Sequence, residues 1–146
     1  MLTTALLCVG CLSSMGGAAP AAAPKTVMTI LIDDLGSYDT AVNNEEIAYI
    51  TPNLHQLSHD DGLKLSRFYT YKYCSPTRRG LLSGRFPVHV SGDQAQPCAN
   101  DLPIELTILP QKLKQASTPW ATHMVGKGHL GYPTTDHLPF NRGFDR

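Results

Sequence analysis

The sequence predicts an α/β fold with a largely parallel sheet, and three observations support this prediction. Residues Thr26–Ile32 form an almost uninterrupted apolar run rich in β-formers, which is typical of a strand buried on both faces of a parallel sheet. Trp120–Val125 is interpreted as a second buried strand. Helix-like and strand-like segments alternate between these two runs, as they do in α/β proteins.

The first segments after the Thr26–Ile32 strand carry clear boundary signals. Thr51 is a typical N-cap, Pro52 suits the first helical position, and Gly62 is a typical helix stop. We therefore expect a helix between Thr51 and Gly62. The alternating apolar residues of Leu63–Tyr71 then predict a strand.

Two further helices are expected later in the chain. Residues Pro76–Leu82 predict a short helix with Cys74 at its N-terminus, and Thr107–Ala116 predict another, with Leu109 and Leu113 facing the core. The intervening stretch, from residue 86 to residue 102, is rich in Pro, Gly, Gln and Asn and is expected to be a loop.

Composition excludes several classes of protein. The chain has 146 residues, of which 42% are hydrophobic and 16% charged, which is the composition of a globular protein of about one domain. Its 12 Lys and Arg residues balance 12 Asp and Glu residues. This neutrality excludes the broad positive surface of a nucleic-acid-binding protein.

Residues Met1–Pro24 resemble a secretory signal peptide. They contain no charged side chain, and an apolar segment, Leu2–Leu12, runs into small residues. The apolar segment is shorter than the roughly 20 residues that span a bilayer, so no stable membrane partner is expected, although a short anchor is an alternative. The sequence thus predicts a leader over residues 1–24, a domain over residues 25–146 and entry into the secretory pathway.

An acidic pair, Asp33-Asp34, directly follows the first predicted strand. Adjacent carboxylates after a buried strand are costly unless a cation neutralises them. Oxygen ligands of this kind suit Ca²⁺, or alternatively Mg²⁺. The alternative without a metal is a helix N-cap beside a solvated carboxylate.

Two other motifs place polar groups where an anion could bind. Cys74 precedes Arg78 by one helical turn, and a helix N-terminus with a nearby arginine attracts anions. Lys127 and His129 lie two apart between glycines, so in an extended segment they project to the same side. An ammonium group can hold anionic oxygens and an imidazole can transfer protons. The alternatives are a Cys74–Cys98 disulfide and a simple exposed loop.

Taken together, these motifs resemble the sulfatase family. The run CSPTRRGLLSGR, from Cys74 to Arg85, is similar to the sulfatase signature C-x-P-x-R with its trailing L-[TS]-G-R segment. ILIDDLG, GKGHLG and NRGFDR are similar to further motifs of that family, in the same order. The resemblance covers most of Thr26–Arg146 and favours the arylsulfatase B-like branch.

The resemblance implies an alkaline-phosphatase-like α/β sandwich with a largely parallel sheet, incomplete in this chain. Residues 25–146 would be the N-terminal part of the catalytic domain of a secreted or lysosomal enzyme that cleaves sulfate esters. A phosphonate or phosphodiester hydrolase of the same fold is one alternative. An inactive secreted fragment with a Cys74–Cys98 disulfide is the other.

The resemblance also implies a role for each matching residue. Cys74 would be oxidised to formylglycine by the formylglycine-generating enzyme, and the hydrated aldehyde would be the nucleophile. Calcium would be bound by Asp33 and Asp34 together with an oxygen of the residue derived from Cys74. Arg78 would hold the hydrate, Lys127 would bind the sulfate, and His129 would hydrogen-bond the formylglycine hydroxyl and assist its deprotonation.

The sequence also departs from the family pattern. Gly128 stands where the family usually has tryptophan, and Thr77 replaces the commoner serine. The later family elements, an Asp-Asn metal pair, a second histidine and a second lysine, are absent, so we expect this chain alone to be inactive. The remaining histidines are expected to be structural or exposed; they are His55, His59, His89, His123 and His137.

Overall fold

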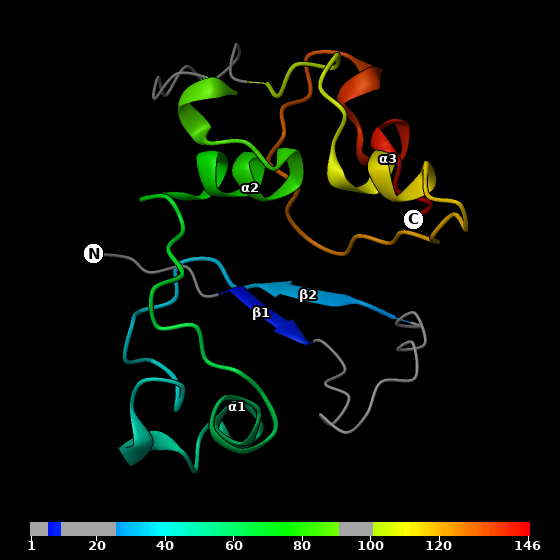
Figure 1. Cartoon of the computed structure of the whole chain (residues 1–146). Coiled ribbons are helices and arrows are strands. Elements are labelled where there is room, and N and C mark those ends of the chain that lie inside the picture. The colour runs from blue at the N-terminus through cyan, green and yellow to red at the C-terminus, as the bar shows by residue number, and fades with distance from the viewer. Residues whose placement is uncertain (1–5, 10–25, 91–100) are drawn as a thin grey trace. The chain divides into compact units, whose positions relative to one another are not determined.

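The computed structural model describes residues 6–9, 26–90 and 101–146 (Figure 1). The chain divides into two compact units, Met1–Lys72 and Tyr73–Arg146. Most of the expected leader and the whole of residues 91–100, which include Cys98, lie outside the described residues.

The sheet of the first unit is antiparallel. Strand β1 (Leu6–Val9) pairs with β2 (Met28–Leu31), so that Leu6 lies opposite Leu31 (Figure 1). The side chains of Met28 and Ile30 are 59% and 41% exposed. The predicted buried, parallel strand is therefore wrong for this part of the chain. Burial of both faces requires covering layers and neighbours on both edges, and the described residues pair β2 only with β1.

The predicted helix boundaries in the first unit are confirmed. Helix α1 (Pro52–Gln56) continues into a π-helical turn, η2 (Leu57–Asp61), which ends at Gly62. A short 3-10 turn, η1 (Glu45–Ile47), precedes them. Thr51 stands at the N-cap, but its hydroxyl accepts a hydrogen bond from the backbone N–H of Ala41 at 2.9 Å. The N-cap residue thus anchors the preceding loop instead of capping the helix.

The strand predicted over Leu63–Tyr71 is wrong. This stretch is irregular, and Leu63 and Tyr69 are 78% and 79% exposed. Alternation stabilises a strand only when a neighbouring strand takes up its backbone hydrogen bonds. Among the described residues no strand pairs with this stretch.

Helix α2 (Cys74–Ser83) opens the second unit and confirms the predicted helix. It ends at Gly84, whose φ of +66° places it in the left-handed region and whose N–H donates to the Gly80 carbonyl at 2.9 Å. This is a common glycine-terminated helix end. Five consecutive residues from Ser75 to Arg79 are buried, whereas the first residue of the helix, Cys74, is half-buried.

Among the described residues of the second unit, four buried apolar side chains form a core cluster: Val90, Leu102, Ile108 and Leu130. Ile108 precedes helix α3 (Leu109–Lys114), which contacts α2 (Figure 1). Helix α3 is shorter than predicted, and a different face of it is buried. Leu109 is 46% exposed, whereas Ile108 and Pro110 are buried, so the expected core position of Leu109 is wrong.

The segment Trp120–Val125 is extended but is not a buried strand. The Met124 N–H donates to the Arg146 carbonyl at 2.8 Å, and the Asp145 N–H donates to the Thr122 carbonyl at 2.7 Å. Val125 is fully exposed. The prediction of a buried strand is wrong here for the same reason as in the first unit. This segment pairs with a short C-terminal segment and not with the strands of a larger sheet.

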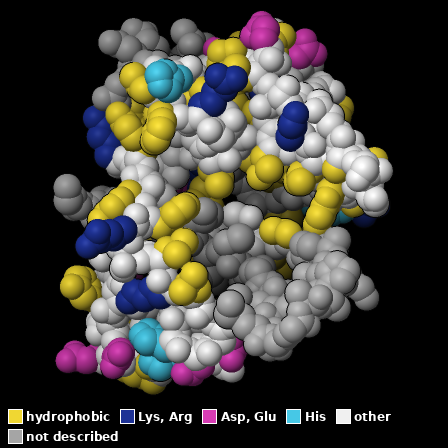
Figure 2. All heavy atoms as spheres, viewed as in Figure 1, with side chains coloured by type: hydrophobic (Ala, Val, Ile, Leu, Met, Phe, Trp, Pro, Cys, Tyr) yellow, Lys and Arg dark blue, Asp and Glu magenta, His cyan; other side chains and the backbone are white. Residues whose placement is uncertain are grey.

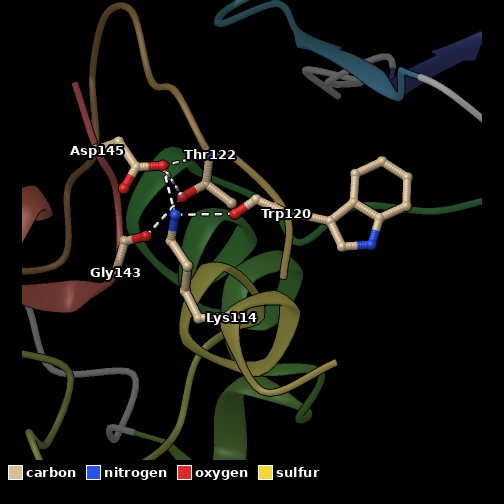
Figure 3. A network of polar contacts seen from close by, with 5 residues as sticks. All are labelled: Lys114, Trp120, Thr122, Gly143 and Asp145. Atoms are coloured by element: carbon tan, nitrogen blue, oxygen red, sulfur yellow. Dashed lines mark hydrogen bonds and ion pairs between the residues drawn. The ribbon is translucent and has the colours of Figure 1, made fainter. Parts of the chain in front are cut away.

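A polar network fastens that C-terminal segment to α3 (Figure 3). The ammonium of Lys114 forms an ion pair with the Asp145 carboxylate and donates to the Trp120 carbonyl at 2.8 Å. The Thr122 N–H donates to the same carboxylate at 2.7 Å, and the Thr122 hydroxyl donates to the Gly143 carbonyl at 2.6 Å. The hydrogen bond from Lys114, followed by that from Thr122, lowers the pKa of Asp145.

Three 3-10 turns complete the described part of the second unit, and apolar side chains of both units lie at the surface. The turns are η3 (Pro87–His89), η4 (Thr135–His137) and η5 (Pro139–Arg142). Figure 2 shows many hydrophobic side chains at the surface. None of the helices in the described ranges has the length and apolar character needed to cross a bilayer.

Candidate functional site

Cys74 is the first residue of helix α2. Its thiol is free and the residue is half-buried. One turn later, the Thr77 hydroxyl donates to the Tyr73 carbonyl at 2.8 Å, so the side chain of Thr77 binds the backbone at the helix start. The unpaired N–H groups of a helical first turn favour an anion or an electron-rich oxygen at such a position. The alternative Cys74–Cys98 disulfide involves a residue outside the described part of the chain.

Arg78 links helix α2 to the segment that follows residue 125. Its side chain is buried, with a relative exposure of 9%, and its Nη1 donates to the Lys127 carbonyl at 2.6 Å. These two residues are 49 positions apart in the sequence. The structure therefore brings the cysteine-bearing helix and the Lys127–His129 loop together. We call Cys74, Arg78, Lys127 and His129 the Cys74 half-site.

Lys127 and His129 are both exposed, but their backbone differs from the expected extended geometry. His129 has a φ of +58°, which is not extended backbone. The prediction that Lys127 and His129 belong to one extended segment is therefore wrong at this residue. Among the described residues only Asp34, with a φ of +54°, shares this left-handed conformation without being glycine. Such backbone costs about 1 kcal/mol or more and is concentrated at functional sites.

The acidic pair follows β2 in a turn of the first unit, with Asp33 half-buried and Asp34 exposed. Carboxylate oxygens fit a hard cation such as calcium by their donor chemistry. Two side chains supply only part of the six to eight oxygens of a roughly complete calcium shell. Within the described ranges, no three His, Cys, Asp or Glu side chains converge as a metal site.

Three side chains of the second unit that interact electrostatically were not predicted as a group: Arg79, Asp101 and His137. Arg79 is 2% exposed. Burial lowers the pKa of its guanidinium, while the charge of Asp101 opposes that shift. The same Asp101 carboxylate lies 2.7 Å from Nε2 of His137, whose Nδ1 lies 3.0 Å from the Thr134 hydroxyl oxygen. The expected structural role of His137 is consistent with its 7% exposure.

Sequence comparison identifies the family. The family model described as Sulfatase matches residues 25–146. Mouse arylsulfatase J is 39% identical over 121 residues, covering 80% of this chain and 19% of that protein. Human N-acetylgalactosamine-6-sulfatase is 34% identical over 140 residues, covering 88% and 26% of the two chains. Human arylsulfatase A is 35% identical over 130 residues, covering 86% of this chain and 25% of that protein.

The chain spans between 19% and 28% of the length of these and other curated relatives. No solved structure matches it significantly. The family match covers both the acidic pair of the first unit and the whole Cys74 half-site. The chain belongs to the sulfatase family.

Proposed function

We propose that this chain is the part of an arylsulfatase-type sulfuric ester hydrolase that carries the nucleophile and half of the sulfate-binding groups. Family membership over residues 25–146 supports this proposal, as do relatives named arylsulfatase J and arylsulfatase A. The substrate class is accordingly a sulfate ester.

The hydrogen bond from Arg78 to the Lys127 carbonyl is the observation that carries the proposal. It joins the two motifs that a sulfatase would need in one place, the cysteine helix and the lysine-histidine loop. Neither motif alone distinguishes an anion site from a helix end or a loop. Their attachment through a buried arginine supports a single anion-binding site.

The residues of the Cys74 half-site have suitable chemistry for this reaction. A sulfate ester spreads negative charge over its oxygens, so cationic groups stabilise it in the transition state. Lys127 would bind the sulfate oxygens, and Arg78 would offset negative charge beside residue 74. His129 would accept a proton from the nucleophile during sulfate release. Formylglycine derived from Cys74 would supply a hydrated aldehyde as the nucleophile.

Calcium is the metal that we propose for the acidic pair, with magnesium as the alternative. Asp33 and Asp34 would hold it, together with an oxygen of residue 74. A bound divalent cation would polarise a sulfate oxygen. The remaining ligands would have to come from outside the described residues.

We also propose a partner and a location. Formylglycine formation requires a formylglycine-generating enzyme, which would act on the unfolded segment around Cys74. The uncharged Met1–Pro24 segment supports entry into the secretory pathway, so the protein would be secreted or lysosomal.

Mass spectrometry of one peptide tests the proposal. Trypsin cleaves after Lys72 and Arg78, which isolates Tyr73–Arg78 with the single Cys74. For protein made in a secretory system, we expect a loss of about 18 Da relative to the thiol peptide. The Arg78→Ala variant, which breaks the C-x-P-x-R pattern, should retain the thiol. Its tryptic peptide ends at Arg79 instead of residue 78. A Cys74–Cys98 crosslink in place of the mass loss would contradict the proposal.

An activity assay distinguishes the two enzyme functions. The full-length protein is offered an aryl sulfate and the matching aryl phosphate diester. We expect hydrolysis of the sulfate and its loss in Cys74→Ala. Preferential cleavage of the phosphate ester would instead support a phosphodiester hydrolase of the same fold.

A further inference from the structure

We propose that Asp145 is a positioning residue for the Lys127–His129 loop. Its carboxylate fastens the segment that leads into this loop, residues 120–124, to helix α3 (Figure 3). The relevance of this role to catalysis rests on the proposed function, which assigns Lys127 to the sulfate and His129 to proton transfer. The positioning itself is argued from hydrogen bonds within the second unit.

The Asp145 carboxylate joins two parts of the unit. Its Oδ2 atom accepts a hydrogen bond from the Thr122 N–H at 2.7 Å and forms an ion pair with the Lys114 ammonium. The ammonium also donates to the Trp120 carbonyl at 2.8 Å. Both side chains of the ion pair are partly exposed, so the pair alone is weak. The attachment therefore depends on the hydrogen bond to Thr122, a residue that is 7% exposed.

Backbone hydrogen bonds continue this attachment toward the loop. The Asp145 N–H donates to the Thr122 carbonyl at 2.7 Å, and the Met124 N–H donates to the Arg146 carbonyl at 2.8 Å. Met124 precedes Lys127 by three residues, which span at most about 11 Å of extended chain. The start of the loop is thus fixed close to its lysine.

The rest of the loop is attached at two other points. The Leu102 N–H donates to the Leu130 carbonyl at 2.8 Å, and both residues belong to the buried core cluster. Arg78 of helix α2 donates to the Lys127 carbonyl at 2.6 Å. Neither attachment is made by Asp145. Loss of the Asp145 carboxylate should therefore loosen the loop at its start.

The same support is connected to the helix that carries Cys74. Helix α3, which provides Lys114, contacts helix α2, which provides Cys74 and Arg78. The loop is thus fastened to α3 ahead of Lys127 and to α2 at the Lys127 carbonyl. Groups that act together in a site keep their geometry only when the residues that support them are themselves fixed. Asp145 has the contacts that such support requires.

Limited proteolysis with trypsin under native conditions tests this inference, because Lys127 is exposed. Cleavage after Lys127 requires the loop to open locally. Asp145→Ala removes the acceptor, and we expect the initial rate of cleavage after Lys127 to rise about tenfold, since cleavage follows the population of the open form. The exposed Arg85 of the same unit is the internal control. Its cleavage rate should stay close to that of the wild type.

Two further variants make the experiment specific. Asp136→Ala removes an exposed carboxylate outside the network of Figure 3 and should leave the rate at Lys127 unchanged. Asp145→Asn keeps an oxygen that can accept from the Thr122 N–H but loses the charge, so its rate should lie between those of the wild type and Asp145→Ala. If Asp145→Ala does not fold, Asp145→Asn carries the test, with an increase of about threefold at Lys127 relative to Arg85.

Two results of the proteolysis would overturn the inference. Equal increases at Lys127 and Arg85 would mean that Asp145 stabilises the whole unit and does not hold the loop in particular. An unchanged rate at Lys127 would mean that the other attachments are sufficient. The cleavage rates do not depend on formylglycine or on sulfatase activity, so they decide the attachment even if the proposed function fails.

The role in the reaction is measured with the full-length protein and an aryl sulfate, below the melting temperature of each variant. We expect kcat/KM to fall about tenfold in Asp145→Ala, because a displaced Lys127 holds the sulfate less well. Asp136→Ala should keep the wild-type value. An unchanged kcat/KM in Asp145→Ala would overturn the link to catalysis, whereas an inactive wild-type protein would contradict the proposed function.

Discussion

The two units differ in how they hold their predicted site residues. In the second unit, Arg78 is buried and bonded to a carbonyl 49 positions away. In the first unit, Asp33 and Asp34 follow β2, whose residue Met28 is 59% exposed. The Cys74 half-site is therefore supported by a contact between distant parts of the chain, whereas the acidic pair follows a short strand with exposed side chains.

Buried arginines account for much of this difference. Arg142 is 2% exposed, and its guanidinium donates to the carbonyls of Pro103 and Leu106 at 3.1 to 3.4 Å. Arg78 and Arg79 are buried in the same unit. Each guanidinium is a rigid multiple donor that can hold loop carbonyls in place. Among the described residues of the first unit no arginine is buried.

The largest effect is expected from Gly131→Ala in the second unit. Gly131 has a φ of +92°, and an added Cβ would lie 2.5 Å from the Asp101 Cβ. Strain and overlap with the fixed Asp101 backbone should together lower the free energy of unfolding by at least about 3 kcal/mol. Thermal unfolding should show a decrease in melting temperature of about 10 to 20 °C.

Two alanine variants provide controls for this prediction. Gly126 has a φ of +104° but no atom within 4 Å of the added Cβ, so Gly126→Ala should cost only about 1 kcal/mol from backbone strain. In the first unit, the atoms nearest to the Cβ of Gly36→Ala belong to the flexible carboxylate of Asp39, which can move away. Equal losses for all three variants would show that the two units are equally rigid.

Arg142→Met should have the next largest effect. This variant removes the guanidinium donor from the Pro103 and Leu106 carbonyls while it keeps most of the side-chain volume. The Pro103 carbonyl keeps the hydrogen bond from the Leu106 N–H at 3.1 Å. We expect a loss of about 2 to 3 kcal/mol, measured by urea denaturation. Arg85→Met replaces an exposed arginine of the same unit and should change stability by less than about 0.5 kcal/mol. A neutral Arg142→Met would contradict the view that buried arginines hold this unit together.

The sequence predicted helices better than strands, and the reason is physical. Thr51-Pro52 and Gly62 are local signals, and helix α1 with its π-helical turn begins and ends at them. A strand depends on a partner that its own sequence does not specify. Leu63–Tyr71 has the alternating pattern but no pairing strand in the described residues. The Thr26–Ile32 strand exists in part, but the pattern could not show that β1 would pair with it.

The sequence predicts the residues of the candidate site better than it predicts the contacts between distant parts of the second unit. Cys74, Arg78, Lys127 and His129 lie in motifs that can be identified along the chain. A contact elsewhere in the second unit, between the Asp101 carboxylate and Nε2 of His137, joins residues 36 positions apart. No periodicity or motif connects positions so far apart, so only the folded chain reveals them as neighbours.

Acid should weaken the second unit through Asp145. Its pKa is lower in the folded state than the ordinary value of 3.8, first because of the hydrogen bond from Lys114 and then because of that from Thr122. The ionised contact therefore stabilises the fold above that ordinary value, and the stabilisation is lost as the pH falls through the folded-state value. We expect a falling melting temperature below about pH 4, and a flatter profile in Asp145→Asn. Asp136→Asn, an exposed carboxylate variant, should keep the wild-type profile.

The smallest effect is expected from Ile30→Thr on β2. Ile30 is 41% exposed, whereas Leu102 in the second unit is fully buried. Ile30→Thr keeps β-branching and should change the free energy of unfolding by less than about 0.5 kcal/mol, while Leu102→Ala should cost about 2 to 5 kcal/mol. Urea denaturation of the same chain measures both. A large loss from Ile30→Thr would mean that another surface covers β2 in solution, and the contrast between the exposed strand and the buried core of the second unit would then disappear.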